Sequence, residues 1–161
     1  MKKNLIDEYI ETLKKTKLEQ DDYANKLSVM QANRASKKLR KIASNIDSSS
    51  LELKEDFLNL LDIEEDGLDR YVAHHILELM NYDIKAQQRA ILILEDVARG
   101  DELVESFGTQ RWLIDWYRKH PDFEAKEDII RKHEEKLQEG RSMMKKIAEI
   151  NNKRMINNST K

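Results

Sequence analysis

The four histidines are the side chains of this sequence whose chemistry suits a metal ion. His74 and His75 are adjacent, and the other two are His120 and His133. Neighbouring residues on a helix point ~100° apart, so the adjacent pair cannot chelate one ion as residues four apart would. No glutamate lies three residues before any histidine, which excludes the Glu-x-x-His pattern of di-iron proteins. His75 with Glu78 has a spacing that allows shared ligation, but a partly buried His75 beside a solvated His74 is the favoured interpretation.

The sequence contains no recognisable motif for covalent catalysis. It has no cysteine, which excludes disulfides, thiolate chemistry and sulfur-ligated zinc or iron sites. It also lacks a Gly-x-Ser-x-Gly elbow, and its four scattered glycines form no phosphate-binding loop. We therefore expect no catalytic residues, no metal and no cofactor, and predict that the protein is not an enzyme.

The strongest signal is an acidic segment in the middle of the chain. Residues 51–110 carry 15 Asp and Glu against 5 Lys and Arg, a net charge of −10, whereas residues 1–50 and 111–161 each carry a net charge of +4. The acids gather around two predicted turns: Asp62, Glu64, Glu65, Asp66 and Asp69 at one, and Glu95, Asp96, Asp101, Glu102 and Glu105 at the other. Some stabilise helix N-termini, but caps do not explain the regional excess. Because alternate turns of a helix stack emerge on one edge, we expect a single negative surface.

A group of aromatic residues follows the acidic segment. Trp112 and Trp116 are four residues apart and share one face of a predicted helix, with Tyr117 on an adjoining side. Arg111 and Arg118 flank them. Tryptophan, tyrosine and arginine are enriched in binding hot spots, so Trp112 and Trp116 are candidate binding residues. The favoured interpretation is that both rings cover the end of the core.

The elements that must position these residues are helices. Apolar residues recur every three to four positions, and one proline and four glycines among 161 residues are too few for the turns of a sheet protein. The pattern predicts an all-α fold with helices over residues 3–18, 22–46, 51–61, 68–80, 84–98, 102–119 and 124–155. Asp83 and Asp101 are predicted N-caps, and Gly100 is predicted to end its helix in the left-handed conformation.

Two of these helices have unusual apolar patterns. The helix over 84–98 is apolar around more than half its circumference at Ile91 to Leu94, so we expect neighbours to cover several of its sides. The helix over 102–119 is expected to bury Leu103 and Val104 with the rest of its apolar residues. The long helix over 124–155 carries a thin stripe, and it either folds back on the stack, which we favour, or pairs with a second copy as a coiled coil.

Residues 56–118 resemble HEAT-like helical repeats, and more narrowly a small bacterial HEAT-like family. The resemblance rests on Leu60-Leu61-Asp62 closing one helix, Leu68 opening the next, Val72-Ala73 as a small packing pair, the Ala98-Arg99-Gly100 stop and the Leu113 to Trp116 segment. It implies a right-handed stack of antiparallel helix pairs that offers surface to partners, and it implies no reaction. We divide the chain into a HEAT-like helical domain, residues 1–121, and a C-terminal helical extension with a disordered tail, residues 122–161.

These features favour a cytoplasmic, non-catalytic protein-binding module whose acidic surface binds a basic protein. By analogy, an immunity or antitoxin-like protein that occupies a basic toxin fits this description.

No window is apolar enough to span a bilayer, so no membrane partner is expected. Nucleic acid is disfavoured because the central segment repels phosphate. The alternative is a nucleic-acid-binding or DNA-repair protein that uses the basic flanks, Lys37, Lys38, Arg40, Lys41, Arg131, Lys132, Lys145 and Lys146. A homodimer through the last helix is a third hypothesis.

Overall fold

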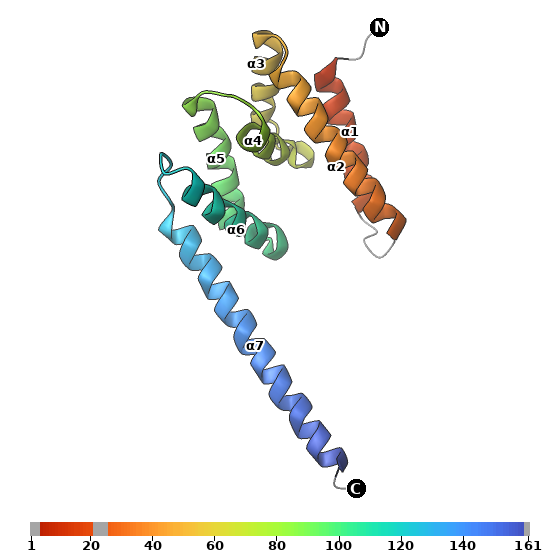
Figure 1. Ribbon diagram of the computed structural model, residues 1–161, viewed down its shortest axis with the longest axis vertical. Helices are drawn as coiled ribbons and strands as arrows, with labels where there is room; N and C mark the ends of the chain where they lie inside the picture. Colours follow the sequence, from red (N-terminus) through yellow and green to blue (C-terminus); the bar gives the residue numbers. More distant parts are fainter. Residues whose placement is uncertain (1–3, 21–25, 160–161) are drawn as a thin grey trace. The chain divides into compact units, whose positions relative to one another are not determined.

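The protein is built from helices, which confirms the all-α prediction. In the computed structural model the backbone is described for residues 4–20 and 26–159, and side chains for residues 4–16 and 29–155. These residues contain seven α-helices and two short 3-10 helices, and no strand (Figure 1). The α-helices are α1 (Leu5–Gln20), α2 (Lys26–Asp47), α3 (Leu51–Asn59), α4 (Leu68–Leu79), α5 (Ile84–Arg99), α6 (Leu103–Lys119) and α7 (Glu127–Ser159); the 3-10 helices are η1 (Leu60–Asp62) and η2 (Glu65–Gly67).

The chain divides into two compact units, residues 1–94 and residues 95–161. The predicted boundary at residue 121 falls inside the second unit, because α6 packs against α7. Helix α7 continues to Ser159, which takes in part of the tail predicted to be disordered, and residues 160 and 161 lie outside the described part.

In the first unit, α1 and α2 lie side by side and antiparallel (Figure 1). Both helices also contact α3, and α2 contacts α4. The core residues recur at helical spacing, as predicted: Ile6, Tyr9 and Leu13 on α1, Leu39, Ile42, Ala43 and Ile46 on α2, Phe57 on α3, and Leu68, Val72, Ala73, Ile76 and Leu77 on α4. Burying one stripe from each helix removes most of the apolar surface of these helices from water.

Tyr9 is the side chain that joins three helices of this core. It is fully buried, and its ring meets Phe57 of α3 edge to face with centroids 5.0 Å apart. Its hydroxyl lies 2.6 Å from Nδ1 of His75 on α4. Burial, and after it the positive charge of Arg40, lower the pKa of His75 to about 4. The imidazole is therefore neutral near pH 7 and accepts the proton of the Tyr9 hydroxyl, so the buried polar pair is satisfied.

A second polar network fixes the ends of α2 and α3 to the segment before α5. Oδ1 of Asp47 accepts hydrogen bonds from Nζ of Lys54 at 2.7 Å and from the backbone N–H of Asn81 at 2.9 Å. Nζ of Lys54 also donates to the Asn81 carbonyl, and the Tyr82 hydroxyl donates to the carbonyl of Lys54. Burial acts to raise the pKa of Asp47, but the bonds from Lys54 and Asn81 outweigh it and lower the pKa.

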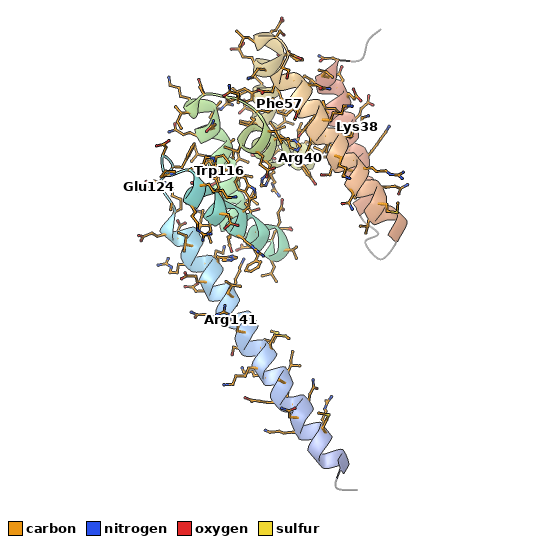
Figure 2. All side chains as sticks on the ribbon, in the orientation of Figure 1. Lys38, Arg40, Phe57, Trp116, Glu124 and Arg141 are labelled. Carbon is orange, nitrogen blue, oxygen red and sulfur yellow. The ribbon has the colours of Figure 1, made fainter. Side chains whose placement is uncertain are left out.

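In the second unit, α7 folds back along α6 over its first turns only. Ile129 and His133 are buried there, and the His133 ring stacks on Phe107 of α6 at 4.5 Å. Nζ of Lys132 donates to the Arg99 carbonyl at 2.6 Å, and Nζ of Lys136 donates to the Ser106 hydroxyl at 2.9 Å. From Leu137 to Met155 every side chain is exposed, and this half of α7 extends away from α6 (Figures 1 and 2).

Of the predictions made for the helix ends, the one for Asp83 is confirmed and those for Gly100 and Asp101 are wrong. Asp83 caps α5 as predicted, accepting from the Ala86 N–H at 2.9 Å. Gly100, however, does not adopt a positive φ. Among the described residues that conformation belongs to Asp66 and Gly67, where the chain turns from η2 into α4. Helix α6 begins after Glu102 with no side-chain cap, so Asp101 does not cap it.

Three apolar side chains that were expected to be covered are exposed. Leu92 of α5 is exposed, although Ala90, Ile91, Leu94 and Ala98 of that helix are buried. On α6, Leu103 is 68% exposed and Val104 is 87% exposed. Periodicity placed both residues on the inner face, but in the structure the start of α6 is exposed.

The Tyr9–His75 pair makes stability depend on pH. Between the ordinary histidine pKa and about 4, the unfolded chain holds a proton at His75 that the folded protein does not hold. Lowering the pH from ~6.5 to ~4 should therefore reduce the free energy of unfolding, by up to ~3 kcal/mol from this group. Urea unfolding followed by circular dichroism at several pH values measures the effect.

The matched control is His75→Gln, which should be less stable at pH 7 but should show a weaker dependence over the same range. Equal pH dependence in the two proteins would contradict a neutral, buried His75.

Candidate protein-binding surface

The acids of the first unit lie on a turn with a defined backbone. Asp62, Glu64, Glu65 and Asp66 are all exposed. The N–H of Gly67 donates to the Glu64 carbonyl at 2.9 Å, which closes this turn. Asp66 has φ of 60°, a conformation that aspartate tolerates better than most residues. The carboxylates are therefore held around one rigid turn.

This turn borders a small hollow that is lined mainly by apolar side chains. We call it the acidic hollow because two carboxylates of the turn also line it. Its volume is about 200 Å³, and its lining consists of Ile10, Leu13, Lys14, Ile63, Glu65, Asp66 and Leu68. Apolar side chains from α1, the turn and α4 line most of it, while two carboxylates and one ammonium group contribute charge. Such a combination of an apolar centre and a charged rim is typical of protein interfaces.

The acids of the second unit also surround exposed apolar side chains. Asp101, Glu102 and Glu105 are exposed at the start of α6, and they flank Leu103 and Val104. We call these five residues the α6 patch. The sequence signal for Leu103 and Val104 was misleading, because their helical spacing indicated burial. The acids that flank them, Asp101, Glu102 and Glu105, are the sequence feature that indicates an exposed turn.

Two predicted members of the acidic surface are buried instead. Glu95 is only 3% exposed, and it accepts a hydrogen bond from the Tyr117 hydroxyl at 2.7 Å. Nη1 of Arg99 lies 3.6 Å from the same carboxylate. Asp69 is also buried, and its Oδ1 has no hydrogen-bond partner among the described residues. Both residues belong to the interior, which corrects their assignment to a partner-binding surface.

The bonds around Glu95 connect three helices of the second unit. Nε of Arg99 donates to Oδ2 of Asp128 on α7 at 2.7 Å, so one guanidinium group serves two carboxylates. The hydrogen bond from Arg99 lowers the pKa of Asp128. Burial raises the pKa of Tyr117, and the bond to Glu95 raises it further, which keeps the hydroxyl protonated as a donor. Asp96, the neighbouring acid, is exposed and lies 4.0 Å from Arg99.

The two tryptophans form a stack within the second unit. Their rings lie nearly parallel with centroids 5.3 Å apart, and Trp116 stacks in turn on His120 at 3.5 Å. Phe123 meets Trp116 edge to face at 6.0 Å. Trp116 is buried and Trp112 is half-buried. This arrangement agrees with the favoured interpretation, that the rings cover the core, and leaves Trp116 little surface for a partner.

The histidines do not form a metal site. No group of three or more His, Asp or Glu side chains in the described part of the chain could hold a metal ion. His75 contacts Tyr9, while Glu78 pairs with Arg40 at 2.6 Å and lies 3.8 Å from His74. His75 is buried more deeply than predicted, and the Glu78 carboxylate is engaged by Arg40.

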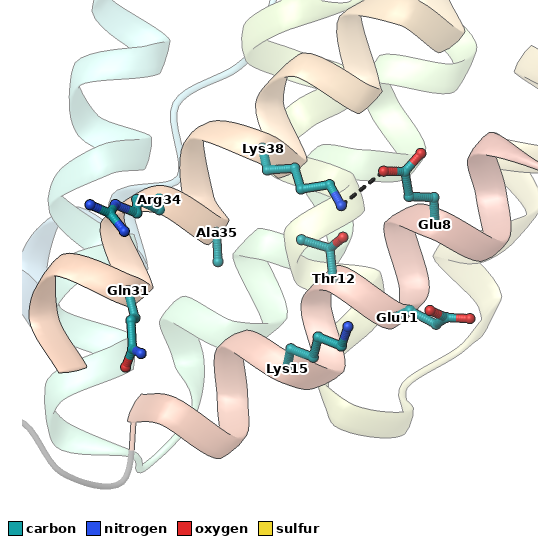
Figure 3. Close-up of a pocket in the computed structure, with 8 residues that line it drawn as sticks. All are labelled: Glu8, Glu11, Thr12, Lys15, Gln31, Arg34, Ala35 and Lys38. Atoms are coloured by element: carbon teal, nitrogen blue, oxygen red, sulfur yellow. Dashed lines mark ion pairs between the residues drawn. The ribbon is translucent and has the colours of Figure 1, made fainter. Parts of the chain in front are cut away.

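A second hollow lies between α1 and α2, with a volume of about 330 Å³ (Figure 3). It is lined by Glu8, Glu11, Thr12, Lys15, Gln31, Arg34, Ala35 and Lys38. Charges of both signs line it, and Nζ of Lys38 lies 2.8 Å from Oε1 of Glu8. The mixed charge favours neither an anion nor a cation.

The basic residues of α2 are partly engaged within the protein. Lys38 pairs with Glu8, and Arg40 pairs with Glu78. Lys37 and Lys41 are exposed on the same helix. On α7, Lys132 is bound to backbone carbonyls, whereas Arg131, Lys145 and Lys146 are exposed. The cations invoked for nucleic-acid binding therefore do not form one free surface on α2.

No family model, curated protein or solved structure matches the chain. The HEAT-like resemblance therefore stays a prediction. Within the described residues, no helix is both long and apolar enough to cross a lipid bilayer.

Tyr117→Phe tests whether Glu95 is structural. The change leaves the Glu95 carboxylate buried without its hydroxyl donor, which should lower the free energy of unfolding by ~1–3 kcal/mol. Chemical denaturation measures the loss. Tyr71→Phe is the matched control, because the Tyr71 hydroxyl makes no hydrogen bond with the described residues, and it should change stability by less than ~0.5 kcal/mol. Equal losses in both variants would argue against the assigned role.

Proposed function

We propose that the protein is a non-catalytic binding module for a basic protein. The observation that carries the proposal is that each exposed acidic cluster borders exposed apolar side chains. Ile63 lies beside the acids of the acidic hollow, and Leu103 and Val104 lie among the acids of the α6 patch. Apolar contacts supply affinity once water is excluded, and surrounding carboxylates select a partner of opposite charge.

The charge distribution supports a basic partner over a nucleic acid. The segment that contains both clusters has a net charge of −10, and none of Glu64, Glu65, Asp66, Asp101 or Glu102 forms an ion pair with another described residue. Such a surface repels phosphate and accelerates association with a cationic protein. An immunity or antitoxin-like role, in which the acids cover the basic surface of a toxin such as a nuclease, is consistent with this chemistry and with the lack of a catalytic motif.

The proposed framework is a HEAT-like stack of antiparallel helix pairs. The antiparallel contact of α1 with α2 and the contact of α6 with α7 support it, each within its own unit. Short connections, at residues 48–50, 80–83 and 100–102, also suit a series of stacked hairpins.

Charge reversal at the clusters tests the binding proposal. The immobilised protein should retain a basic protein from native lysate at low salt and release it at high salt. Once that protein is purified, Glu64→Lys with Glu65→Lys, or Asp101→Lys with Glu102→Lys, should weaken its binding about tenfold or more, because each variant replaces attraction with repulsion. Titration calorimetry measures the change.

The matched control is Glu55→Lys with Asp56→Lys on α3, which alters net charge equally at exposed acids outside both clusters. This control should leave affinity within about threefold of the original. The proposal is wrong if retention is insensitive to salt, or if the α3 control weakens binding as much as the cluster variants do.

A further inference from the structure

The outer half of α7 is an exposed helix. Residues 137–155 are exposed throughout, although they form regular helix. The exposure includes large apolar side chains: Met143 is 65% exposed, Met144 67%, Ile147 45% and Ile150 51%. An isolated helix with such side chains in water gains little from packing, because most helical stability in proteins comes from burial of one face.

These apolar side chains share one face of α7. At ~100° per residue, Met143, Met144 and Ile150 all lie within about 60° of Ile147 around the helix axis. Leu137 extends the same stripe toward the start of the exposed half. The stripe is therefore roughly 140° wide, which is broader than the narrow seam of a coiled coil and matches a helix that lies on an apolar layer.

The charges around the stripe are mostly positive. Residues 137–155 contain five cations, Arg141, Lys145, Lys146, Lys153 and Arg154, and two acids, Glu139 and Glu149, for a net charge of +3. No ion pair with another described residue neutralises any of the five cations.

The placement of these charges is ordered around the axis. Lys146 and Lys153 lie on one side of the stripe, about 100–120° from Ile147, and Arg141 lies at about the same angle on the other side. Lys145 and Glu149 lie on the back of the helix, Glu139 lies about 80° from Ile147 on the side of Lys146, and Arg154 lies within the stripe near its C-terminal end. Lysine and arginine side chains at the edges of an apolar stripe can reach anionic groups with their charged ends, while their methylene groups stay in contact with an apolar layer.

We propose that the outer half of α7 binds the surface of an anionic lipid bilayer. Met143, Ile147 and Ile150 insert at the level of the acyl chains, and Arg141, Lys146 and Lys153 contact lipid phosphates. Glu149 faces water. The helix lies in the plane of the interface, which is compatible with the finding that no described helix crosses a bilayer. This role is separate from the proposed binding of a basic protein, which uses acids outside α7.

Charge and length favour a lipid surface over a second copy of the chain. Parallel pairing of two such helices, or antiparallel pairing about Ile147, brings one segment of net charge +3 against another of the same charge. The exposed half also provides fewer than the ~3 clean heptads that a stable coiled coil needs, since Asn151 and Arg154 interrupt the stripe. A bilayer of anionic lipid has the complementary charge and an apolar interior.

Vesicle co-sedimentation of the full-length protein tests the proposal. Binding is measured with phosphatidylcholine vesicles and with vesicles of equal parts phosphatidylcholine and phosphatidylglycerol. The protein should bind the anionic vesicles and should bind the neutral ones at least about tenfold more weakly, since each cation near an anionic surface contributes to affinity. Lys146→Glu with Lys153→Glu, and separately Met143→Ser with Ile147→Ser, should each reduce binding to anionic vesicles about tenfold or more.

Two matched controls separate α7 from the rest of the chain. Lys37→Glu with Lys41→Glu makes the same change of net charge on α2, and Leu51→Ser with Leu92→Ser removes two exposed apolar side chains elsewhere. Both controls should bind within about threefold of the original protein. All altered residues are exposed, so each variant should retain the helical circular-dichroism spectrum.

Three outcomes would overturn the proposal. The first is that the protein binds neither kind of vesicle. The second is that Met143→Ser with Ile147→Ser leaves vesicle binding intact, which would indicate attraction to any polyanion, nucleic acid included, and no insertion. The third is that light scattering finds twice the monomer mass, and that the same serine variant restores the monomer, which would assign the stripe to a second copy. None of these results bears on the charge-reversal test of the acidic clusters.

Discussion

Removal of one apolar stripe per helix from water is the constraint on which this structure depends. In the first unit, α1 to α4 satisfy it by packing around Tyr9, Phe57 and Ile76, all fully buried. In the second unit, α6 and the first turns of α7 satisfy it through Leu113 and Ile129. Beyond Leu137 the same kind of stripe continues along α7 with no helix of that unit to cover it. This segment therefore differs from the rest of the protein, because a stripe of this width costs free energy in water unless something covers it.

Two buried polar groups, one in each unit, are stabilised by specific partners. The Tyr9 hydroxyl meets a neutral His75, and Glu95 meets Tyr117 and Arg99. An unpaired buried carboxylate or imidazole would cost several times what one hydrogen bond contributes. These pairs therefore fix how α1 packs on α4, and how the last residues of α5, 95–99, lie against α6, more strictly than apolar contacts do, because a hydrogen bond tolerates little displacement.

Acids of identical chemistry have different roles along this chain. Glu64 and Glu65 lie on an exposed turn beside the acidic hollow, whereas Glu95 lies inside the second unit. All three belong to the segment of net charge −10, and charge counting alone assigned them to one surface. Glu95 differs from the other two in its position. It lies next to Leu94 on the buried side of α5, where the Tyr117 hydroxyl of α6 donates a hydrogen bond to its carboxylate. A partner can reach the first two and not the third.

The sequence by itself determined the helices, because the three-to-four-residue spacing of apolar side chains and the scarcity of proline and glycine are local properties. It also determined the Asp83 cap and the burial of His75. Only the tertiary structure decided that Leu103, Val104 and Leu92 are exposed, that Asp69 and Glu95 are buried, and that Gly100 keeps a negative φ. Periodicity shows which side of a helix is apolar, but not how far the neighbouring helix extends along it. That length depends on contacts between residues distant in sequence, and such contacts leave no local pattern.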